Sequence, residues 1–184
     1  GYDFIHKLKN SFYKNFECDY FFCFSKLEKE KIEKIIKANF ILLGSLKNNL
    51  IEIKNRRKKK QLVYISAYRS DLLAKPSIKQ MYESEKLLLP IVYSFCKRKN
   101  IKLKILPGEK ESLVQKKYYS DIIKSNKFSI YKRDIDKSYS RIDESLLSVC
   151  VDSSLGFEAL SRGNKVGFFN FFNYLDKSFS SRIF

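Results

Sequence analysis

The run of residues with the clearest chemical pattern is Val149–Leu160, with the sequence VCVDSSLGFEAL. An apolar stretch ends at Asp152, two serines follow, and a helix-favouring segment begins directly after them. The unpaired N–H groups in the first turn of a helix attract anions, and the hydroxyls of Ser153 and Ser154 would lie beside them. This pattern predicts a site for a phosphate group or another anion.

Two further residues of the same run extend this pattern. Gly156 has no side chain at a place where a ligand could approach the first turn of the helix. Glu158 lies one turn in, where its carboxylate could accept hydrogen bonds from ribose hydroxyls. A structural interpretation is equally open on spacing alone: Ser153 or Ser154 caps the helix, and Glu158 interacts favourably with the helix dipole.

The chain offers few other groups for catalysis. Its four cysteines form no C-x-x-C pair, and His6 is its single histidine. A zinc site needs Cys/His clusters, and a Ser-His-Asp triad needs a well-placed histidine. We expect no metal site, four reduced thiols and a cytoplasmic location. No catalytic base can be assigned. Asp152 is available, but an aspartate between the end of a strand and the start of a helix more often has a structural role than a catalytic one.

The net charge of the chain is +17, from 37 basic and 20 acidic residues. Only Asn55–Lys60 (NRRKKK) is a dense basic run. The excess of lysine fits either a solvated surface or attraction to an anionic partner, namely nucleic acid, acidic lipid or nucleotide phosphate. A nucleic-acid-binding module remains an alternative hypothesis, although the aromatic residues lie in core-like apolar runs and no nucleic-acid-binding motif is present.

The apolar content of the chain is sufficient for a folded core, since 44% of its residues are hydrophobic and 15% are aromatic. No apolar run approaches the ~20 residues that a membrane-spanning helix needs. The first ten residues also lack the apolar region of a secretory signal. We therefore expect a chain with a folded core that does not cross a bilayer.

The elements that must position the candidate residues alternate between strand and helix. Strands are predicted at Cys18–Ser25, Asn39–Leu43, Gln61–Ser66, Ile101–Leu106, Phe128–Lys132, Ser145–Asp152 and Val166–Phe169. Helices are predicted at Lys26–Lys37, Ile78–Asn100, Glu111–Asn126 and Leu155–Arg162. This alternation predicts an α/β fold with a Rossmann-like parallel sheet, helices on both faces, and ligands at the carboxyl ends of the strands.

Local signals support three of these helices. Ser25 and Glu28 have the spacing of a capping box at the start of the first helix. Pro90 lies inside the second helix and should kink it or split it in two. Gly163-Asn164 is a typical end signal for the last helix.

The segment SVCVDSSLGFEALSRGNKVGFF resembles the signature of bacterial surface-polysaccharide transferases of the GT-B type, and is similar to O-antigen and capsule biosynthesis proteins. The matching residues are Asp152, Ser153, Ser154, Leu155, Gly156, Phe157, Glu158, Ala159, Leu160, Arg162, Gly163, Lys165 and Val166. Weaker matches are Phe24-Ser25, Leu43–Asn49, Lys137–Tyr139 and Ile142-Asp143. The similarity covers most of Tyr20–Phe169, but only Asp152–Val166 is specific.

The resemblance implies two Rossmann-like domains facing a cleft, with a nucleotide-sugar donor held mainly by the C-terminal one. It implies no nicotinamide cofactor and no obligatory metal. By this resemblance Ser153 and Ser154 would contact the donor phosphate, Gly156 would allow its approach, and Glu158 would face the ribose.

Weaker expectations rest on the predicted topology. Arg69, just after the first strand of the donor domain, is a second phosphate-binding candidate, because arginine suits bidentate phosphate contacts. Pro107, Gly108, Arg133 and Tyr139 would lie on the rim of the same site. Arg69 and Arg133 fit ordinary surface positions equally well.

The expected domains are residues 1–55, as a remnant of an acceptor-side domain with a linker, and residues 56–184, as a nucleotide-sugar-binding domain that is incomplete at its C-terminus. We expect a fragment that mainly carries the C-terminal half of a GT-B architecture. The expected activity is glycosyl transfer for O-antigen, lipopolysaccharide or capsule assembly, with an inactive Rossmann-like fragment as an alternative. The expected partners are a nucleotide sugar, a lipid-linked or polysaccharide acceptor, and the anionic inner membrane leaflet.

Overall fold

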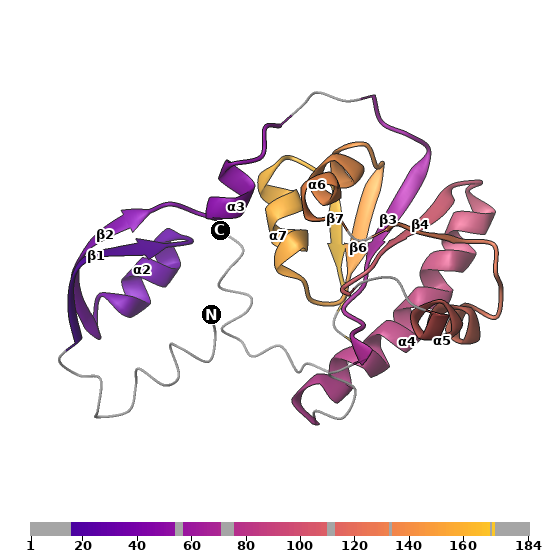
Figure 1. Ribbon diagram of the computed structural model, residues 1–184, viewed down its shortest axis with the longest axis horizontal. Helices are drawn as coiled ribbons and strands as arrows, with labels where there is room; N and C mark the ends of the chain where they lie inside the picture. Colours follow the sequence, from indigo (N-terminus) through magenta and orange to yellow (C-terminus); the bar gives the residue numbers. More distant parts are fainter. Residues whose placement is uncertain are drawn as a thin grey trace. The chain divides into compact units, whose positions relative to one another are not determined.

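The computed structural model describes residues 16–53, 57–70, 76–109, 113–132, 134–169 and 171. The chain forms two compact units. The first unit holds the elements from β1 to α3, and the second holds the elements from β3 to β7 (Figure 1).

The first unit is a strand–helix–strand motif. Strand β1 (Phe16–Cys23) pairs in parallel with β2 (Ile36–Leu42), and helix α2 (Lys26–Ile32) connects them. A short helix, α3 (Leu46–Asn49), follows β2. Ile32 of α2 and Ile36 of β2 form the buried centre of this unit.

The predicted Ser25 cap of α2 is confirmed, but Glu28 bonds the residue before Ser25 and so does not close the predicted capping box. The hydroxyl of Ser25 accepts a hydrogen bond from the N–H of Glu28 at 3.2 Å. The carboxylate of Glu28 accepts the N–H of Phe24 at 2.6 Å. The predicted end of this helix at Lys37 was wrong, because the chain turns after Ile32 and Ile36 already pairs with β1. Ile32 and Ile36 have helical spacing, but they bury their side chains from two different elements.

The second unit contains a five-stranded parallel sheet in the order β5-β4-β3-β6-β7. Its strands are β3 (Gln61–Ile65), β4 (Lys102–Leu106), β5 (Ser129–Ile130), β6 (Leu147–Cys150) and β7 (Val166–Phe168). Its helices are α4 (Pro76–Arg98), α5 (Leu113–Ile123), α6 (Ile135–Asp143) and α7 (Ser154–Ser161). The strand order reverses between β3 and β6, because the chain crosses from β5 to the other side of β3.

Both faces of this sheet are covered by helices, as Figure 1 shows. All five residues of β3 are buried, and alternate side chains point to opposite faces. Leu62 and Tyr64 belong to the core with α4 and α5. Val63 and Ile65 belong to the core with α6 and α7. The strand order and the two helical layers make this a Rossmann-like α/β fold, as the sequence predicted.

Two details of the second unit differ from the prediction. Helix α4 runs through Pro90 as one element, so the predicted split was wrong, whereas the kink predicted as the other outcome stays a prediction. Helix α6 was not predicted from the sequence. Asp134 caps it by accepting the N–H of Lys137 at 3.0 Å, and Tyr139 and Ile142 bury their side chains. An N-cap aspartate followed by apolar residues three positions apart is the signal that could have located it.

Candidate functional site

The candidate site lies at the carboxyl ends of β3, β4 and β6. In open α/β sheets, ligands bind at this edge where the strand order reverses, which here is between β3 and β6. Three segments follow these strand ends in the chain: residues 66–70 after β3, residues 107–109 after β4, and residues 151–153 after β6. We call this place the crevice edge.

Ser153 is the N-cap residue of α7, with extended backbone angles (φ −158°, ψ 128°). Its carbonyl accepts the N–H groups of Gly156 and Phe157 at 3.0 and 3.4 Å. Its hydroxyl makes no capping hydrogen bond, so this side chain does not satisfy the first turn of the helix. The neighbouring Ser154 side chain is exposed. Two hydroxyls therefore lie at the start of a helix that directly follows β6, and their binding of an anion stays a prediction.

Glu158 and Tyr139 were predicted separately, as a ribose contact and a rim residue, and the structure brings them together. The Tyr139 hydroxyl donates to Oε2 of Glu158 at 2.8 Å. The Tyr139 side chain is almost fully buried, and burial together with this hydrogen bond raises the pKa of its hydroxyl. Glu158 is half-buried, so the contact orients a carboxylate that is still partly exposed.

Gly156 packs against the sheet. A Cβ atom at this position would lie 2.7 Å from Sγ of Cys150 and 2.9 Å from Cε1 of Phe168, which is too close for either contact. The glycine therefore allows α7 to approach β6 and β7 closely. This packing role was not predicted, and the expectation that Gly156 also makes room for a ligand stays a prediction.

Arg69 lies in the turn after β3, and its side chain is exposed. Its carbonyl accepts the hydroxyl of Tyr82 at 3.1 Å, which fixes the backbone of this turn. Its guanidinium has no hydrogen-bond or ion-pair partner among the described residues. The next residue, Ser70, donates both its N–H and its hydroxyl to Glu109, at 2.9 and 3.0 Å. The turns after β3 and β4 are thus joined beside the candidate arginine.

The predicted rim residues Pro107 and Gly108 begin the turn after β4. A Cβ atom on Gly108 would lie 3.0 Å from the carbonyl oxygen of Tyr68 and 3.1 Å from that of Ser66. Gly108 therefore lies directly against the turn that carries Arg69. Arg133, the other predicted rim residue, lies outside the described residues.

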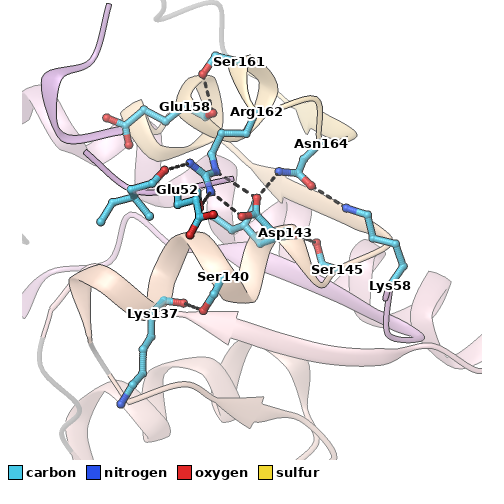
Figure 2. A network of polar contacts seen from close by, with 12 residues as sticks. Glu52, Lys58, Lys137, Ser140, Asp143, Ser145, Glu158, Ser161, Arg162 and Asn164 are labelled. Atoms are coloured by element: carbon cyan, nitrogen blue, oxygen red, sulfur yellow. Dashed lines mark hydrogen bonds and ion pairs between the residues drawn. The ribbon is translucent and has the colours of Figure 1, made fainter. Parts of the chain in front are cut away.

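Arg162 and Asn164, within the run Asp152–Val166, have a structural role that sequence reasoning missed. Arg162 donates to both oxygens of Asp143, through Nε at 3.1 Å and through Nη2 at 2.6 Å. The two side chains are only 1% and 5% exposed. Asp143 also accepts the amide of Asn164 at 2.9 Å, and Asn164 in turn accepts from Lys58 at 2.7 Å (Figure 2).

The same arginine also holds the segment that precedes the basic run. Its Nη1 and Nη2 atoms donate to the carbonyls of Ile51 and Glu52 at 2.9 and 3.1 Å (Figure 2). Asp143 and Arg162 end helices that precede β6 and β7, so this network lies toward the amino ends of those strands, opposite the crevice edge. The two partners lie 19 positions apart, and an aspartate and an arginine at that spacing form no recognised motif.

Two general findings concern the described part of the chain. It contains no cluster of three or more His, Cys, Asp or Glu side chains that could hold a metal ion. Among its helices, none combines the length and the apolar character that crossing a bilayer requires.

Comparison with known proteins assigns the chain to a family. No curated protein matches the chain. A family profile described as "putative O-antigen biosynthesis protein" matches residues 2–182, which is nearly the entire sequence. The chain therefore belongs to this family of O-antigen biosynthesis proteins, which associates it with the assembly of a surface polysaccharide.

Proposed function

We propose that the chain binds a nucleotide-activated sugar at the crevice edge and serves as a glycosyltransferase-type domain in surface-polysaccharide biosynthesis. The family association with O-antigen supports the polysaccharide part of this proposal. The Rossmann-like sheet supports the nucleotide part, since such sheets bind nucleotides where their strand order reverses.

One observation carries the proposal. Strands β3 and β6 are neighbours at the reversal point, so the turn with exposed Arg69 and the α7 start with Ser153 and Ser154 both follow the carboxyl ends of adjacent strands. A guanidinium and two hydroxyls at a helix start are groups that recognise phosphate oxygens. Glu158, oriented by Tyr139, adds an acceptor for ribose hydroxyls within the first turns of α7.

The proposed chemistry is departure of the nucleotide, which leaves as a nucleoside diphosphate from UDP or GDP sugars and as CMP from CMP sugars, while the sugar moves to an acceptor hydroxyl. Cationic and hydrogen-bond-donating groups that meet the developing phosphate charge stabilise that step. In this proposal Arg69, Ser153 and Ser154 supply those groups. The acceptor is a lipid-linked or growing glycan. The general base that takes the proton of the acceptor hydroxyl belongs to an acceptor-side domain of GT-B type.

In this proposal, the net charge of +17 attracts the chain to the anionic inner leaflet of the membrane, where the acceptor is located. The contacts of the basic run weaken the nucleic-acid alternative. Lys58 donates to Asn164 at 2.7 Å, and Lys59 pairs with Glu144 at 2.5 Å. Two lysines of that run are therefore engaged within the fold, near the end of the sheet opposite the crevice edge.

A thermal-shift titration tests the proposal. The chain is mixed with UDP-, GDP- and CMP-activated sugars, with a single-stranded oligonucleotide as the comparison ligand. A ligand at about a hundred times its Kd adds roughly 2.7 kcal/mol to the free energy of unfolding, which raises the Tm by several degrees. A rise with one nucleotide class supports the proposal. A rise with the oligonucleotide alone, lost at high salt, contradicts it.

A further inference from the structure

A buried carboxylate holds the turn that carries Arg69. Glu85, on α4, has no exposed surface. It accepts the hydroxyl of Ser66 at 2.7 Å through Oε1 and the N–H of Ala67 at 2.9 Å through Oε2. The Ser66 hydroxyl in turn accepts the N–H of Tyr68 at 3.1 Å. Three consecutive residues of the turn after β3 are therefore fixed directly or indirectly by one side chain.

Tyrosines surround this carboxylate. The hydroxyls of Tyr64, Tyr118 and Tyr119 are buried, and none makes a well-formed hydrogen bond with any residue that the structure describes. Tyr68 stacks on Tyr118 with ring centroids 3.9 Å apart. Such a cluster excludes water from Glu85, and it is a costly environment for a negative charge.

The groups facing Glu85 come from every element around it. Tyr64 of β3 and Tyr118 of α5 act on its ionisation, and Ser66 and Ala67 bind it from the turn. Burial raises the pKa of the Glu85 carboxyl to about 7, and the smaller opposing effect comes from the hydrogen bonds of Ser66 and Ala67 and from the nearby hydroxyls of Tyr64 and Tyr118. No lysine or arginine is among the groups that act on it in the described part of the chain.

Neighbouring titratable groups complete this environment. Tyr119 of α5 is influenced by the charges of Glu85 and of Glu109, which lies in the turn after β4. Burial and, to a smaller extent, the charge of Glu109 raise the pKa of Tyr68 in the turn. On the side of β6, Cys150 acts on Tyr64. All of these groups are neutral or acidic, so none of them stabilises the ionised form of Glu85 as a cation would.

We propose that Glu85 is a positioning residue that makes ligand binding at the crevice edge depend on pH. The proposal rests on the nucleotide-sugar function proposed above. An anionic ligand bound beside the turn after β3 opposes a second negative charge beneath that turn. Ligand binding is therefore coupled to uptake of a proton by Glu85 from the solvent, and the affinity falls as the pH rises through 7.

Isothermal titration with the nucleotide sugar that gives the largest thermal shift tests this coupling. Nucleotide sugars suit the test because their phosphate or diphosphate diester does not titrate between pH 6 and 8. Binding is measured at pH 6 and pH 8, and at pH 7 in two buffers with different ionisation enthalpies, which report proton uptake. The wild type is compared with Glu85→Gln, which keeps the shape but cannot ionise. Glu83→Gln on the same helix is the control, because Glu83 is exposed and pairs with Lys86.

The wild type and Glu83→Gln should bind about three- to tenfold more weakly at pH 8 than at pH 6 and should take up a fraction of a proton at pH 7. Glu85→Gln should show neither effect. Ser66→Ala removes a hydrogen bond that favours the ionised carboxylate, so it should move the midpoint of the pH profile upward. This second variant keeps the proposal testable if Glu85→Gln does not fold.

Failure of this inference differs from failure of the function on which it rests. A wild type that binds the nucleotide sugar equally tightly at pH 6 and pH 8, without proton uptake, overturns the role of Glu85 alone. A pH dependence that persists in Glu85→Gln does the same. A wild type that binds no nucleotide sugar at either pH overturns the proposed function and the coupling together.

Discussion

The Tyr139 hydroxyl on α6 donates a hydrogen bond to Oε2 of Glu158 on α7 at 2.8 Å. The guanidinium of Arg162 lies 5.1 Å from the centre of the Tyr139 ring, so the same tyrosine also contacts the buried ion pair behind it. The donor is almost fully buried, and the acceptor is half-buried. A carboxylate in the middle of α7 is thus oriented by a side chain anchored in the core.

Replacing Tyr139 by Phe tests whether this orientation matters for binding. The change removes a hydrogen bond to a carboxylate and should lower the free energy of unfolding by about 1–3 kcal/mol in denaturant titrations. It should also weaken nucleotide-sugar binding several-fold, because Glu158 loses its fixed orientation. Tyr93→Phe is the matched control, since it loses a comparable hydrogen bond to Ser125 (2.7 Å) from a different helix. Equal effects of both variants on binding would contradict the role given to Tyr139.

The pair formed by Asp143 and Arg162 should be a major determinant of stability. Asp143→Ala leaves a buried guanidinium without its carboxylate partner, which should cost about 3–5 kcal/mol of unfolding free energy. The double variant Asp143→Ala/Arg162→Ala should be less destabilised than the sum of the two single variants. Glu83→Ala breaks an exposed pair with Lys86 and should cost less than about 1 kcal/mol. Losses of equal size for Asp143→Ala and Glu83→Ala would show that burial of the pair is not important.

Gly156→Ala should destabilise the second unit through packing. The new methyl group would meet Cys150 Sγ at 2.7 Å and Phe168 Cε1 at 2.9 Å, and overpacking of this kind costs about 1–3 kcal/mol. Adding Cys150→Ala removes one of the two clashes, so the double variant should recover part of the lost stability. A Gly156→Ala variant with wild-type stability but no ligand binding would instead support the predicted role of this glycine in ligand approach.

The stability of the ligand-free protein should fall as the pH rises from about 4.5 to 7. The pKa of Glu85 is raised from 4.5 to about 7 in the folded state, mainly by burial, so the folded chain binds its proton more tightly than the unfolded chain in this window. The full difference is about 3 kcal/mol of unfolding free energy, and it is reached above pH 7. Denaturant titrations of the wild type and Glu85→Gln across this range measure it. Parallel pH profiles of the two proteins would contradict a raised pKa at Glu85.

The fold could be predicted from the sequence because its strongest signals are local. The run QLVYI at Gln61–Ile65 is apolar throughout most of its length, as expected for a central parallel strand covered on both faces, and all five residues are buried. Helix α6 escaped prediction because its helical sequence IDKSYSRID is mostly polar. The end of α2 was misplaced because Ile32 and Ile36 fit a helical repeat even though the chain turns between them.

The candidate site could be predicted only in part, because only some of its contacts join residues that are close in the sequence. Ser153 and Ser154 directly follow a strand in the sequence, so their position at a helix start is readable from neighbours. The partnership of Arg162 with Asp143, and that of Glu85 with Ser66, each join residues 19 positions apart. Such pairs depend on how helices pack on the sheet, which no local pattern reports. Within the specific run, sequence similarity also could not separate the residues at the crevice edge from Arg162, which lies buried at the opposite end.

The most direct test of the proposed function is the affinity of the chain for a nucleotide sugar, measured by isothermal titration with the wild type, Ser153→Ala/Ser154→Ala and Ser161→Ala. Ser161 lies at the far end of the same helix and serves as the control. The account predicts that Ser161→Ala binds like the wild type, whereas the double variant loses at least about tenfold in affinity with little change in Tm. Unchanged affinity in the double variant would show that the start of α7 does not bind the donor phosphate.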